Sequence, residues 1–434
     1  MASTNTTASD LRLGIAGLGT VGTGLVKIVE AQADLIARRT GQRISISAVS
    51  ARSRDKDRGI ALEDYAWEDD PVALATRDDV DVYVELIGGD EGPAKASIEA
   101  AIAAGKDVVT ANKALLAIHG QALAEEAEEA GRVIRYEAAV AGGIPVIKAL
   151  TEGLAGNEIA RVMGVMNGTC NYILTRMESG GLTYQDAFDE ADGLGYLEAD
   201  PNLDVGGIDA GHKLAILSAI AFGAQVDFGA IELDGIGSIT IEDIRAAADM
   251  DYKIKLLGVA QMTGRGLEQR MSPCLVPASS PLGQLEGGTN MVVLEGDAVG
   301  QIVLRGAGAG EGPTASAVMA DICDIARGIR LPTFGQPAAD LRKMRAARAA
   351  VSAPYYLRMQ LVDKPGALAK IAQALGEAGI SIDRMRQYGH DDTTAPVLIV
   401  THKTTRAALD EAIANFAASG VLIGEPVAIR IEAV

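Results

Sequence analysis

The chain has 434 residues, a formal net charge of −19, and 48% hydrophobic and 22% charged residues. Its length predicts several globular domains at roughly 100–200 residues each. Its acidity excludes nucleic acid as a partner, because phosphate binding requires clustered Lys and Arg. The first ten residues are polar, and no uncharged stretch approaches the ~20 residues that span a bilayer. We therefore expect a cytoplasmic protein without a secretory signal or a membrane partner.

Cysteine and histidine give no sign of a metal centre. Cys170, Cys274 and Cys323 are scattered and form no metal-like spacing, and the four histidines are far apart. We interpret the cysteines as small buried hydrophobic residues in a protein of a reducing compartment.

The first ~140 residues alternate short apolar runs with helical patterns. Strands are expected at 11–17, 44–50, 81–87, 107–110 and 132–137, and helices at 22–39, at 93–104 and from about 111 to 129. This alternation predicts right-handed crossovers and a parallel sheet that is covered on both faces. Residues 1–140 are therefore expected to form a doubly wound, Rossmann-type α/β domain.

A mixed α+β domain is expected over 141–312. Helices are predicted near 144–154, 183–192 and 208–222, and strands near 158–166, 269–276 and 299–305. A Gly-rich run at 306–317 precedes a helix at 313–328, whose first turn contains Pro313. Residues 331–354 are interpreted as a linker, with a helical linker as the alternative.

The last ~80 residues, 355–434, are expected to form a separate ferredoxin-like domain. The predicted order is strand 355–362, helix 366–377, strand 380–388, strand 396–402, helix 405–417 and strand 425–432.

The sequence GLGTVG at 17–22 follows a predicted strand and opens a predicted helix. Glycines at these positions permit a tight turn and a close approach of the backbone to a pyrophosphate at a helix N-terminus. The alternative is a Gly-rich turn without a ligand. The predicted cofactor-binding residues of this loop are Gly17, Leu18, Gly19, Thr20, Val21 and Gly22.

The end of the second predicted strand distinguishes NADP from NAD. An NAD-binding domain would place Asp or Glu there, whereas this chain has Ser50 and Arg52 and no acid before Asp55. Arg52 could pair with the 2′-phosphate of NADP. NADP is therefore favoured, with NAD as the alternative cofactor and a solvated basic loop as the alternative role of Arg52.

Two segments carry candidate catalytic lysines. Thr110 and Lys113 follow a parallel strand, at the edge of the sheet where ligands bind. Asp209 and Lys213 lie at i and i+4 of a predicted helix, so they share one face, and Lys213 could donate a proton to an aldehyde oxygen. The alternatives are a solvated Lys113 and an ordinary surface ion pair.

Carboxylates before this helix are candidates for substrate binding. Glu198 could hold a substrate ammonium, and Asp204 lies in the same turn-rich segment. A second turn, at 137–145, combines Glu137 with glycines that permit carbonyls to turn inward, as a hard cation requires. From the residues alone, a plain tight turn is the favoured interpretation of that segment.

Taken together, these motifs resemble homoserine dehydrogenase over about residues 10–350. The resemblance is carried by GLGTVG at 17–22, TANK at 110–113, EAAVAGGIP at 137–145, NGTCNYIL at 167–174, GYLEADP at 195–201, DVGGIDAGHKLAIL at 204–217 and GAGAGEGPTASAV at 306–318. Residues 355–434, with DKPGALAKIAQALGEAGISI at 363–382, resemble an ACT domain, a small module that often binds amino acids.

The resemblance implies interconversion of L-aspartate 4-semialdehyde and L-homoserine, on the path to threonine and methionine. Lys213 would be the proton donor, Asp209 would orient it, and Lys113 would be a second catalytic lysine. Glu198 and Asp204 would bind substrate. The remaining implied residues are Gly308, Gly310, Thr110 and again Lys113 for the cofactor, and Glu137 with the carbonyls of Val140, Gly142 and Ile144 for a sodium or potassium ion.

The resemblance further implies that the helix at 313–330 packs back on the first domain. Threonine is the expected feedback ligand of the ACT domain, and a homodimer or homotetramer is expected. Two rival hypotheses stay open: a semialdehyde dehydrogenase that acts through Cys170, and a catalytically inactive sensor of nucleotide and amino acid.

Overall fold

The computed structural model describes residues 10–387 and 393–433, which form two compact units. The first unit contains the described residues up to Gly168, with Asp209–Ile231 and Thr289–Met344. The second contains Thr169–Ile208, Glu232–Gly288 and the described residues from Arg345 onward. The polar segment 1–9 and residue 388, the end of an expected strand, lie outside the described residues. Within the described residues, no helix is long and apolar enough to cross a membrane.

A six-stranded parallel sheet in the first unit confirms the predicted Rossmann-type fold. Its strand order is β3-β2-β1-β4-β5-β6, with β1 at the centre beside the crossover point. The strands are β1 (Leu11–Ala16), β2 (Ile44–Ser50), β3 (Ala66–Glu68), β4 (Val82–Glu85), β5 (Asp107–Thr110) and β6 (Ile134–Arg135). The connecting helices are α1 (Thr20–Ala31), α2 (Ala33–Thr40), α3 (Pro71–Ala75), α4 (Pro93–Ala103) and α5 (Lys113–Glu129).

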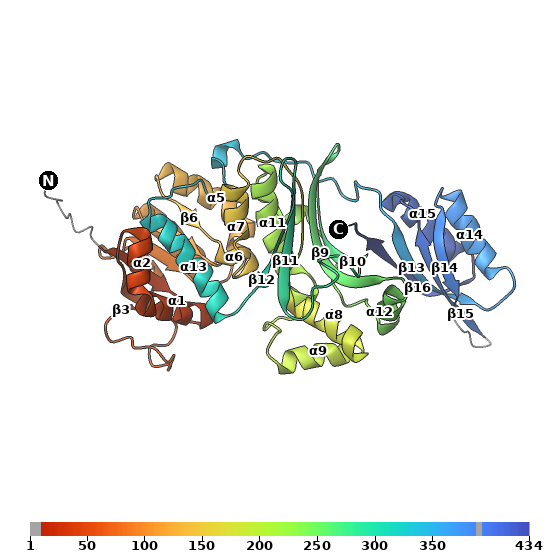
Figure 1. The fold of residues 1–434 in the computed structure, drawn as a ribbon, viewed down its shortest axis with the longest axis horizontal. Coiled ribbons are helices and arrows are strands. Elements are labelled where there is room, and N and C mark those ends of the chain that lie inside the picture. The colour runs from red at the N-terminus through yellow and green to blue at the C-terminus, as the bar shows by residue number, and fades with distance from the viewer. Residues whose placement is uncertain (1–9, 388–392, 434) are drawn as a thin grey trace. The chain divides into compact units, whose positions relative to one another are not determined.

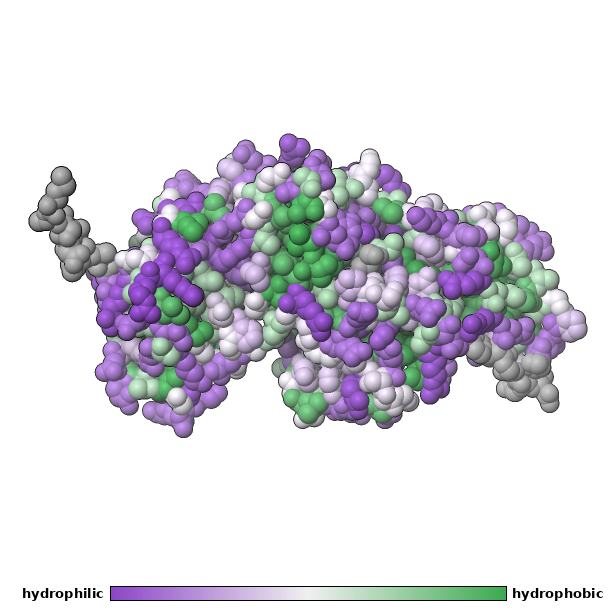
Figure 2. All heavy atoms as spheres, viewed as in Figure 1, coloured by the Kyte–Doolittle hydropathy of each residue, from purple (hydrophilic) through white to green (hydrophobic). Residues whose placement is uncertain are grey.

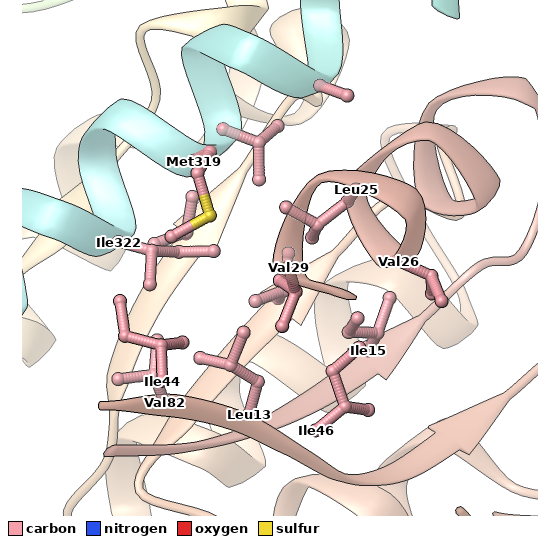
Figure 3. Close-up of a cluster of buried hydrophobic side chains, with 14 of the residues drawn as sticks. Leu13, Ile15, Leu25, Val26, Val29, Ile44, Ile46, Val82, Met319 and Ile322 are labelled. Carbon is pink, nitrogen blue, oxygen red and sulfur yellow. The ribbon is translucent and has the colours of Figure 1, made fainter. Parts of the chain in front are cut away.

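A helix from much later in the chain completes the core of this sheet. Helix α13 (Glu311–Ala326) lies beside α1, and its Met319 and Ile322 point toward Val29 and the strand residue Leu13 (Figures 1 and 3). The approach is close, because a Cβ atom at Gly24 of α1 would lie 3.1 Å from the Cβ of Ala315. Burial of these apolar side chains, at about 25 cal/mol per Å², holds the two helices together.

The rest of the first unit contains a three-stranded antiparallel sheet and a buried helix. The strand order is β12-β11-β7, and most of helix α11 is buried. The elements are β7 (Ile159–Val165), α11 (Ile208–Phe222), β11 (Thr289–Gly296) and β12 (Gly300–Ala307). Apolar residues are visible on the surface over β11 and β12 (Figure 2). Val303 of β12 and Val299 of the turn before it are both exposed.

The second unit contains the predicted ferredoxin-like module and further elements. Its strands follow the order β9-β10-β16-β13-β15-β14, and α14 and α15 pack on the sheet of the module (Figure 1). The strands are β8 (Glu232–Leu233), which pairs with β10, β9 (Tyr252–Thr263), β10 (Gly266–Pro277), β13 (Tyr355–Val362), β14 (Ile382–Gln387), β15 (Thr394–Thr401) and β16 (Leu422–Ile431). The helices are α8 (Gly168–Gly180), α9 (Tyr184–Gly193), α10 (Asn202–Val205), α12 (Ile241–Ala248), α14 (Ala367–Glu377) and α15 (Arg406–Ala418).

Several sequence-based element predictions are wrong. The helix expected at 22–39 is interrupted at Gln32, whose φ of −113° is not helical, and continues as α2. The helix expected at 144–154 is divided into α7 (Val146–Lys148) and a π-helical turn (Ala149–Gly153). The helical alternative for the linker at 331–354 is also wrong, because the helical content of that segment is one 3₁₀ turn, Ala338–Asp340. Strands β9 and β11 and helices α8 and α12 were not predicted, because their apolar residues lack a clean period or lie in polar surroundings.

Candidate active site

The loop after β1 has the geometry of a pyrophosphate cradle. Gly17 has φ +102°, and a Cβ there would lie 2.3 Å from the carbonyl oxygen of Leu86. A Cβ at Gly22 would lie 2.0 Å from the carbonyl oxygen of Gly17, whereas one at Gly19 would meet no atom within 4 Å. Gly17 and Gly22 are therefore required by packing. Gly19 leaves open space at the N-terminus of α1, where a phosphate is stabilised by the helix dipole.

The segment after β2 is an arginine-rich loop beside this cradle. Arg52 is exposed. The side chain of Arg58 donates hydrogen bonds from Nε to the carbonyl oxygen of Leu18 at 3.0 Å and from Nη2 to that of Ser53 at 2.6 Å. Arg54 and Arg58 lie 5.8 Å and 6.0 Å from the centre of the Trp67 ring. Sequence analysis missed Arg58 and Trp67, because their common contacts depend on the path of the loop.

The carboxylate of Asp209 lies between two lysines. Lys213 Nζ donates a hydrogen bond to Asp209 Oδ2 at 2.7 Å, and Lys113 Nζ lies 3.0 Å from Asp209 Oδ1. Asp209 is in the first turn of α11 and Lys213 one turn later, whereas Lys113 begins α5. Asp209 and Lys213 are buried, but the side chain of Lys113 is 31% exposed. The structure thus brings together all three residues that were predicted to be catalytic.

The charges in this cluster stabilise one another. Burial alone would raise the pKa of Asp209, but the ammonium groups of Lys213 and Lys113 outweigh burial and hold that pKa well below its usual range. Lys213 Nζ donates a second hydrogen bond to the carbonyl oxygen of Met166 at 2.8 Å. An ammonium has three donors. Lys213 is therefore fixed by two acceptors and has one N–H left for another oxygen.

Two asparagines that sequence analysis missed support the cluster. Asn167 Nδ2 donates to Asp209 Oδ2 at 3.1 Å, and Asn290 Nδ2 donates to the carbonyl oxygen of Met166 at 3.1 Å. A Cβ at Gly308 would lie 2.0 Å from the amide nitrogen of Asn290, so the Gly-rich run packs directly on this asparagine. Asn167 could have been suspected from the NGTCNY motif, whereas nothing in the sequence marked Asn290.

Thr110 and the Gly-rich run were both predicted to bind cofactor. Thr110 is fully buried, and its hydroxyl donates to Glu85 Oε2 at 2.5 Å. The other oxygen of Glu85 accepts hydrogen bonds from the N–H groups of Ile87 and Gly88. Thr110 therefore fixes the end of β4 through Glu85. Gly310, with φ +114°, precedes the first residue of α13.

The turn at 137–145 is held by a buried carboxylate. Glu137 accepts hydrogen bonds from the N–H groups of Ile147 at 2.9 Å and Lys148 at 2.8 Å. Burial raises the pKa of Glu137 to about 7, assisted by the nearby carboxylate of Asp321, whose Oδ2 accepts from the N–H of Glu137 at 2.7 Å. Gly142 has φ +55°, and a Cβ there would lie 2.4 Å from the carbonyl oxygen of Gly308.

Glu198 and Asp204, the predicted substrate-binding residues, lie together in the second unit. Asp204 is buried, and its Oδ2 accepts a hydrogen bond from the backbone N–H of Glu198 at 3.1 Å. Glu198 itself is exposed. The ring of Tyr196 stacks on that of Tyr172 with 4.7 Å between centroids. The loop that carries Glu198 is thus tied to α8.

Cys170 and His212 both lie in surroundings typical of structural residues. The thiol of Cys170 is fully buried and donates to the carbonyl oxygen of Asp204 at 3.3 Å, which favours a protonated thiol over a nucleophilic thiolate. His212 packs against Phe228 at 4.3 Å between ring centroids, and burial lowers its pKa. Within the described residues, no group of three or more His, Cys, Asp or Glu side chains could hold a metal ion.

A dinucleotide cradle and a fixed lysine in the same compact unit are typical of oxidoreductases that use a nicotinamide cofactor. Matches to protein-family models agree with this class of enzyme. Residues 17–137 match the NAD-binding domain of homoserine dehydrogenase, residues 145–323 match the homoserine dehydrogenase family, and residues 355–418 match the ACT domain.

Individual relatives match over nearly the whole chain. Homoserine dehydrogenases of Neisseria gonorrhoeae and Pseudomonas aeruginosa are 45% and 42% identical, over 93% and 97% of this chain and 94% and 99% of theirs. The crystal structure of a homoserine dehydrogenase from Thiobacillus denitrificans aligns with a TM-score of 0.93 at 40% identity, covering 98% of both chains. The chain belongs to the homoserine dehydrogenase family, whose members are oxidoreductases acting on the CH–OH group of homoserine.

We predict that Asp209→Asn destabilises the protein at neutral pH by about 3–5 kcal/mol, because it leaves two close ammonium groups without their carboxylate. The pKa of Asp209 is lower in the folded than in the unfolded state. Its stabilisation is therefore present above the unfolded value of about 3.9 and is lost as the pH falls further. Urea unfolding followed by circular dichroism between pH 7 and pH 3 measures both effects.

The control is Asp34→Asn, which removes an exposed carboxylate and is expected to change the free energy of unfolding by less than about 0.5 kcal/mol. Equal stability of wild type and Asp209→Asn at pH 7 would contradict the prediction. A difference that persists unchanged to pH 3 would also contradict it.

Proposed function

We propose that the enzyme interconverts L-aspartate 4-semialdehyde and L-homoserine with NADP(H), in the synthesis of threonine and methionine. The observation that carries this proposal is the position of Lys213, fixed by Asp209 and the Met166 carbonyl in the unit that contains the GLGTVG loop. NADPH, when bound, supplies the hydride for the aldehyde carbon.

Lys213 donates a proton to the carbonyl oxygen as that oxygen gains negative charge, and the product is the alcohol of homoserine. In the reverse direction, the same amine accepts the proton from the alcohol. Asp209 holds Lys213 in its orientation, since its carboxylate is ionised at every physiological pH. Lys113 is partly exposed, and it pairs with the other carboxylate oxygen of Asp209. We propose that it polarises the same substrate oxygen or binds the substrate carboxylate.

The proposed substrate ligands of the second unit are Glu198, for the α-ammonium group, and Asp204. The exposed carboxylate of Glu198 and the buried Asp204, which fixes the backbone of Glu198, support this assignment. Gly308, Gly310 and Thr110 are proposed to shape the cofactor site. Gly308 packs on Asn290, and Thr110 orders the end of β4.

NADP is the proposed cofactor, with NAD as the alternative. Arg52 is exposed on the loop that Arg58 ties to the GLGTVG segment, and the end of β2 has no acidic residue. An archaeal homoserine dehydrogenase that is 28% identical, with a TM-score of 0.63 over 75% of this chain, has been solved in complex with NADPH. NADPH carries a 2′-phosphate, and an exposed arginine such as Arg52 can pair with that phosphate.

A sodium or potassium ion is proposed to bind the turn at 137–144. The main-chain carbonyls of Val140, Gly142 and Ile144 would hold it, because hard cations prefer oxygen ligands. The left-handed conformation of Gly142 fits a turn that directs carbonyls inward. The Glu137 carboxylate already accepts two N–H groups, so we assign it to ordering the turn and to supplying negative charge near the ion.

Feedback inhibition by threonine through the ACT domain is also proposed. The ACT module is part of the compact unit that carries Glu198 and Asp204. Its last strand pairs with β10, and Glu432 forms an ion pair with Arg270 of that strand. Deletion of 352–434 would therefore expose part of the core, so regulation is better tested with point variants.

We predict that Lys213→Ala lowers kcat for homoserine oxidation by 10²–10⁴-fold, the usual contribution of a positioned acid or base. The measurement is NADPH formation at 340 nm. Lys343→Ala, an exposed lysine of the same unit, is the matched control and should retain the wild-type rate. A rate that survives in Lys213→Ala would move proton transfer to Lys113 or water. Absence of turnover by wild type in either direction would favour the inactive sensor.

Arg52→Ala is expected to raise KM for NADP by about 10–100-fold, the effect of losing a charge-assisted contact, and to leave KM for NAD within twofold. The ratio of kcat/KM for the two cofactors measures this change. Arg38→Ala, an exposed arginine on α2, serves as control. Equal changes for both cofactors would show that Arg52 does not recognise the 2′-phosphate.

L-Threonine at millimolar concentration is expected to lower the initial rate of the wild-type enzyme. Glycine and L-valine at the same concentration test whether the hydroxyl and the shape of the side chain are recognised. A feedback ligand of ordinary affinity saturates at concentrations up to roughly 50 times that of the substrate. If L-threonine in this range leaves the rate unchanged, threonine is not an effector of this enzyme.

A further inference from the structure

Lys255 of β9 is a buried lysine that the proposed chemistry does not use. It is 2% exposed, and within the described residues its ammonium forms no ion pair with a carboxylate. The two carboxylates that act on its charge, Glu178 and Glu286, are paired instead with Lys253, at 3.2 Å and 3.4 Å. Replacing a buried charge by an apolar side chain is often neutral or stabilising. Packing alone therefore gives no reason for a lysine at this position.

The ammonium of Lys255 is held by two oxygen acceptors. Its Nζ donates a hydrogen bond to Asn171 Oδ1 at 3.0 Å and another to the carbonyl oxygen of Leu285. An ammonium can only donate, so it must face the oxygen of the Asn171 amide and not the nitrogen. Asn171 Nδ2 is thereby directed to the carbonyl oxygen of Gly287, at 2.7 Å. The lysine thus orients the amide that holds the loop 285–288.

Asn171 is the third of three consecutive side chains in the first turn of α8 that each donate to the main chain of another segment. Thr169 Oγ1 donates to the carbonyl oxygen of Tyr196 at 2.9 Å. Cys170 Sγ donates to the carbonyl oxygen of Asp204 at 3.3 Å. The same turn of helix therefore holds both ends of the proposed substrate loop and, through the amide that the lysine orients, a further loop.

The two loops meet at an aromatic ring. A Cβ at Gly288 would lie 3.2 Å from Cε1 of Tyr196, so the main chain of Gly288 packs directly on that ring. The ring also stacks on Tyr172, with 4.7 Å between centroids. Glu198 follows Tyr196 by two residues. The position of the loop 285–288 therefore affects the segment that carries the Glu198 carboxylate.

We propose that Lys255 is a positioning residue for substrate recognition. It orients Asn171 and holds the loop 285–288, and these fix the segment that carries Glu198. The inference rests on the proposed function, in which Glu198 binds the α-ammonium group of homoserine. Lys255 is buried and acts through these neighbours, so the kinetic parameter that depends on it is KM for homoserine.

The first test is Lys255→Met, which keeps the length of the side chain and removes its charge and donors. KM for L-homoserine should rise by at least about tenfold, the effect of weakening one charge-assisted contact. That contact binds ground state and transition state alike, so kcat should stay within about threefold and KM for NADP within about twofold. The measurement is NADPH formation at 340 nm. Lys403→Gln, an exposed lysine of the same unit, is the control and should keep the wild-type KM.

The double variant Lys255→Met with Asn171→Leu distinguishes positioning from plain structural support. It replaces the charge and the amide together by apolar side chains, so no buried amide is left without its partner. Its Tm should equal or exceed that of Lys255→Met, while KM for L-homoserine stays raised. If KM returns to the wild-type value as stability recovers, the pair is only structural and the proposal is overturned. The double variant also carries the test if Lys255→Met alone does not fold.

An independent readout is the pH dependence of stability. Burial lowers the pKa of Lys255 to about 8, and the charge of Lys253 lowers it further, against the opposing charges of Glu178 and Glu286. The unfolded value is about 10.4. The cost of burying the ammonium is therefore present in full below pH 8 and is relieved between about pH 8 and pH 10. The Tm of wild type should rise relative to that of Lys255→Met over this range. A constant difference would show that the lysine is not an unpaired buried charge.

Isothermal titration of L-homoserine in the presence of NADP separates this inference from the proposed function. Absence of turnover by the wild-type enzyme would refute the proposed function. A Kd for L-homoserine that is still raised in Lys255→Met would then support the positioning role. Wild-type turnover together with an unchanged KM and Kd in Lys255→Met would overturn the positioning role and leave the proposed function standing.

Discussion

The candidate active site depends on a single buried carboxylate that is shared by two lysines. A buried charge is tolerated only when it is paired and hydrogen-bonded, and Asp209 meets this condition with Lys213, Lys113 and Asn167. Lys113 begins helix α5, where the helix dipole disfavours a cation. Asp209 therefore does more than orient Lys213, since it also provides the charge that makes the position of Lys113 stable.

Around this cluster, the chain returns to the Rossmann-type sheet at Glu311, after leaving it at Arg135 for more than a third of its length. Helix α13 packs on α1, and the Gly-rich run before it contacts both Asn290 and the turn at 137–145. These contacts involve main-chain atoms at distances that exclude a Cβ. The turn at 137–145 and the support of Lys213 are thus connected through the Gly-rich run, and a substitution at Gly142 or Gly308 would disturb both.

The proposed substrate-binding residues and the ACT module belong to the same compact unit. Glu198 and Asp204 lie in the same compact unit as the ACT module, and α12 lies between them along the chain. Asp243 is buried with an arginine and a tyrosine from the ACT sheet. Removing one partner of such a buried pair would leave the other charge unpaired, so Asp243 fixes α12 against the ACT sheet.

The sequence by itself determined the order of the Rossmann-type and ferredoxin-like elements, because period-2 and period-3.6 patterns and glycine positions are local properties. It also determined the pairing of Asp209 with Lys213, since four residues make one helical turn. It did not predict the break at Gln32, and it missed α8 and α12. It gave no reason to connect Lys113 with Asp209, which are 96 residues apart, or to single out Asn290, Arg58 and Asp243. Only the tertiary structure decided these, because each gains its role from a partner brought close by folding, and a buried charge or amide is defined by what surrounds it in space.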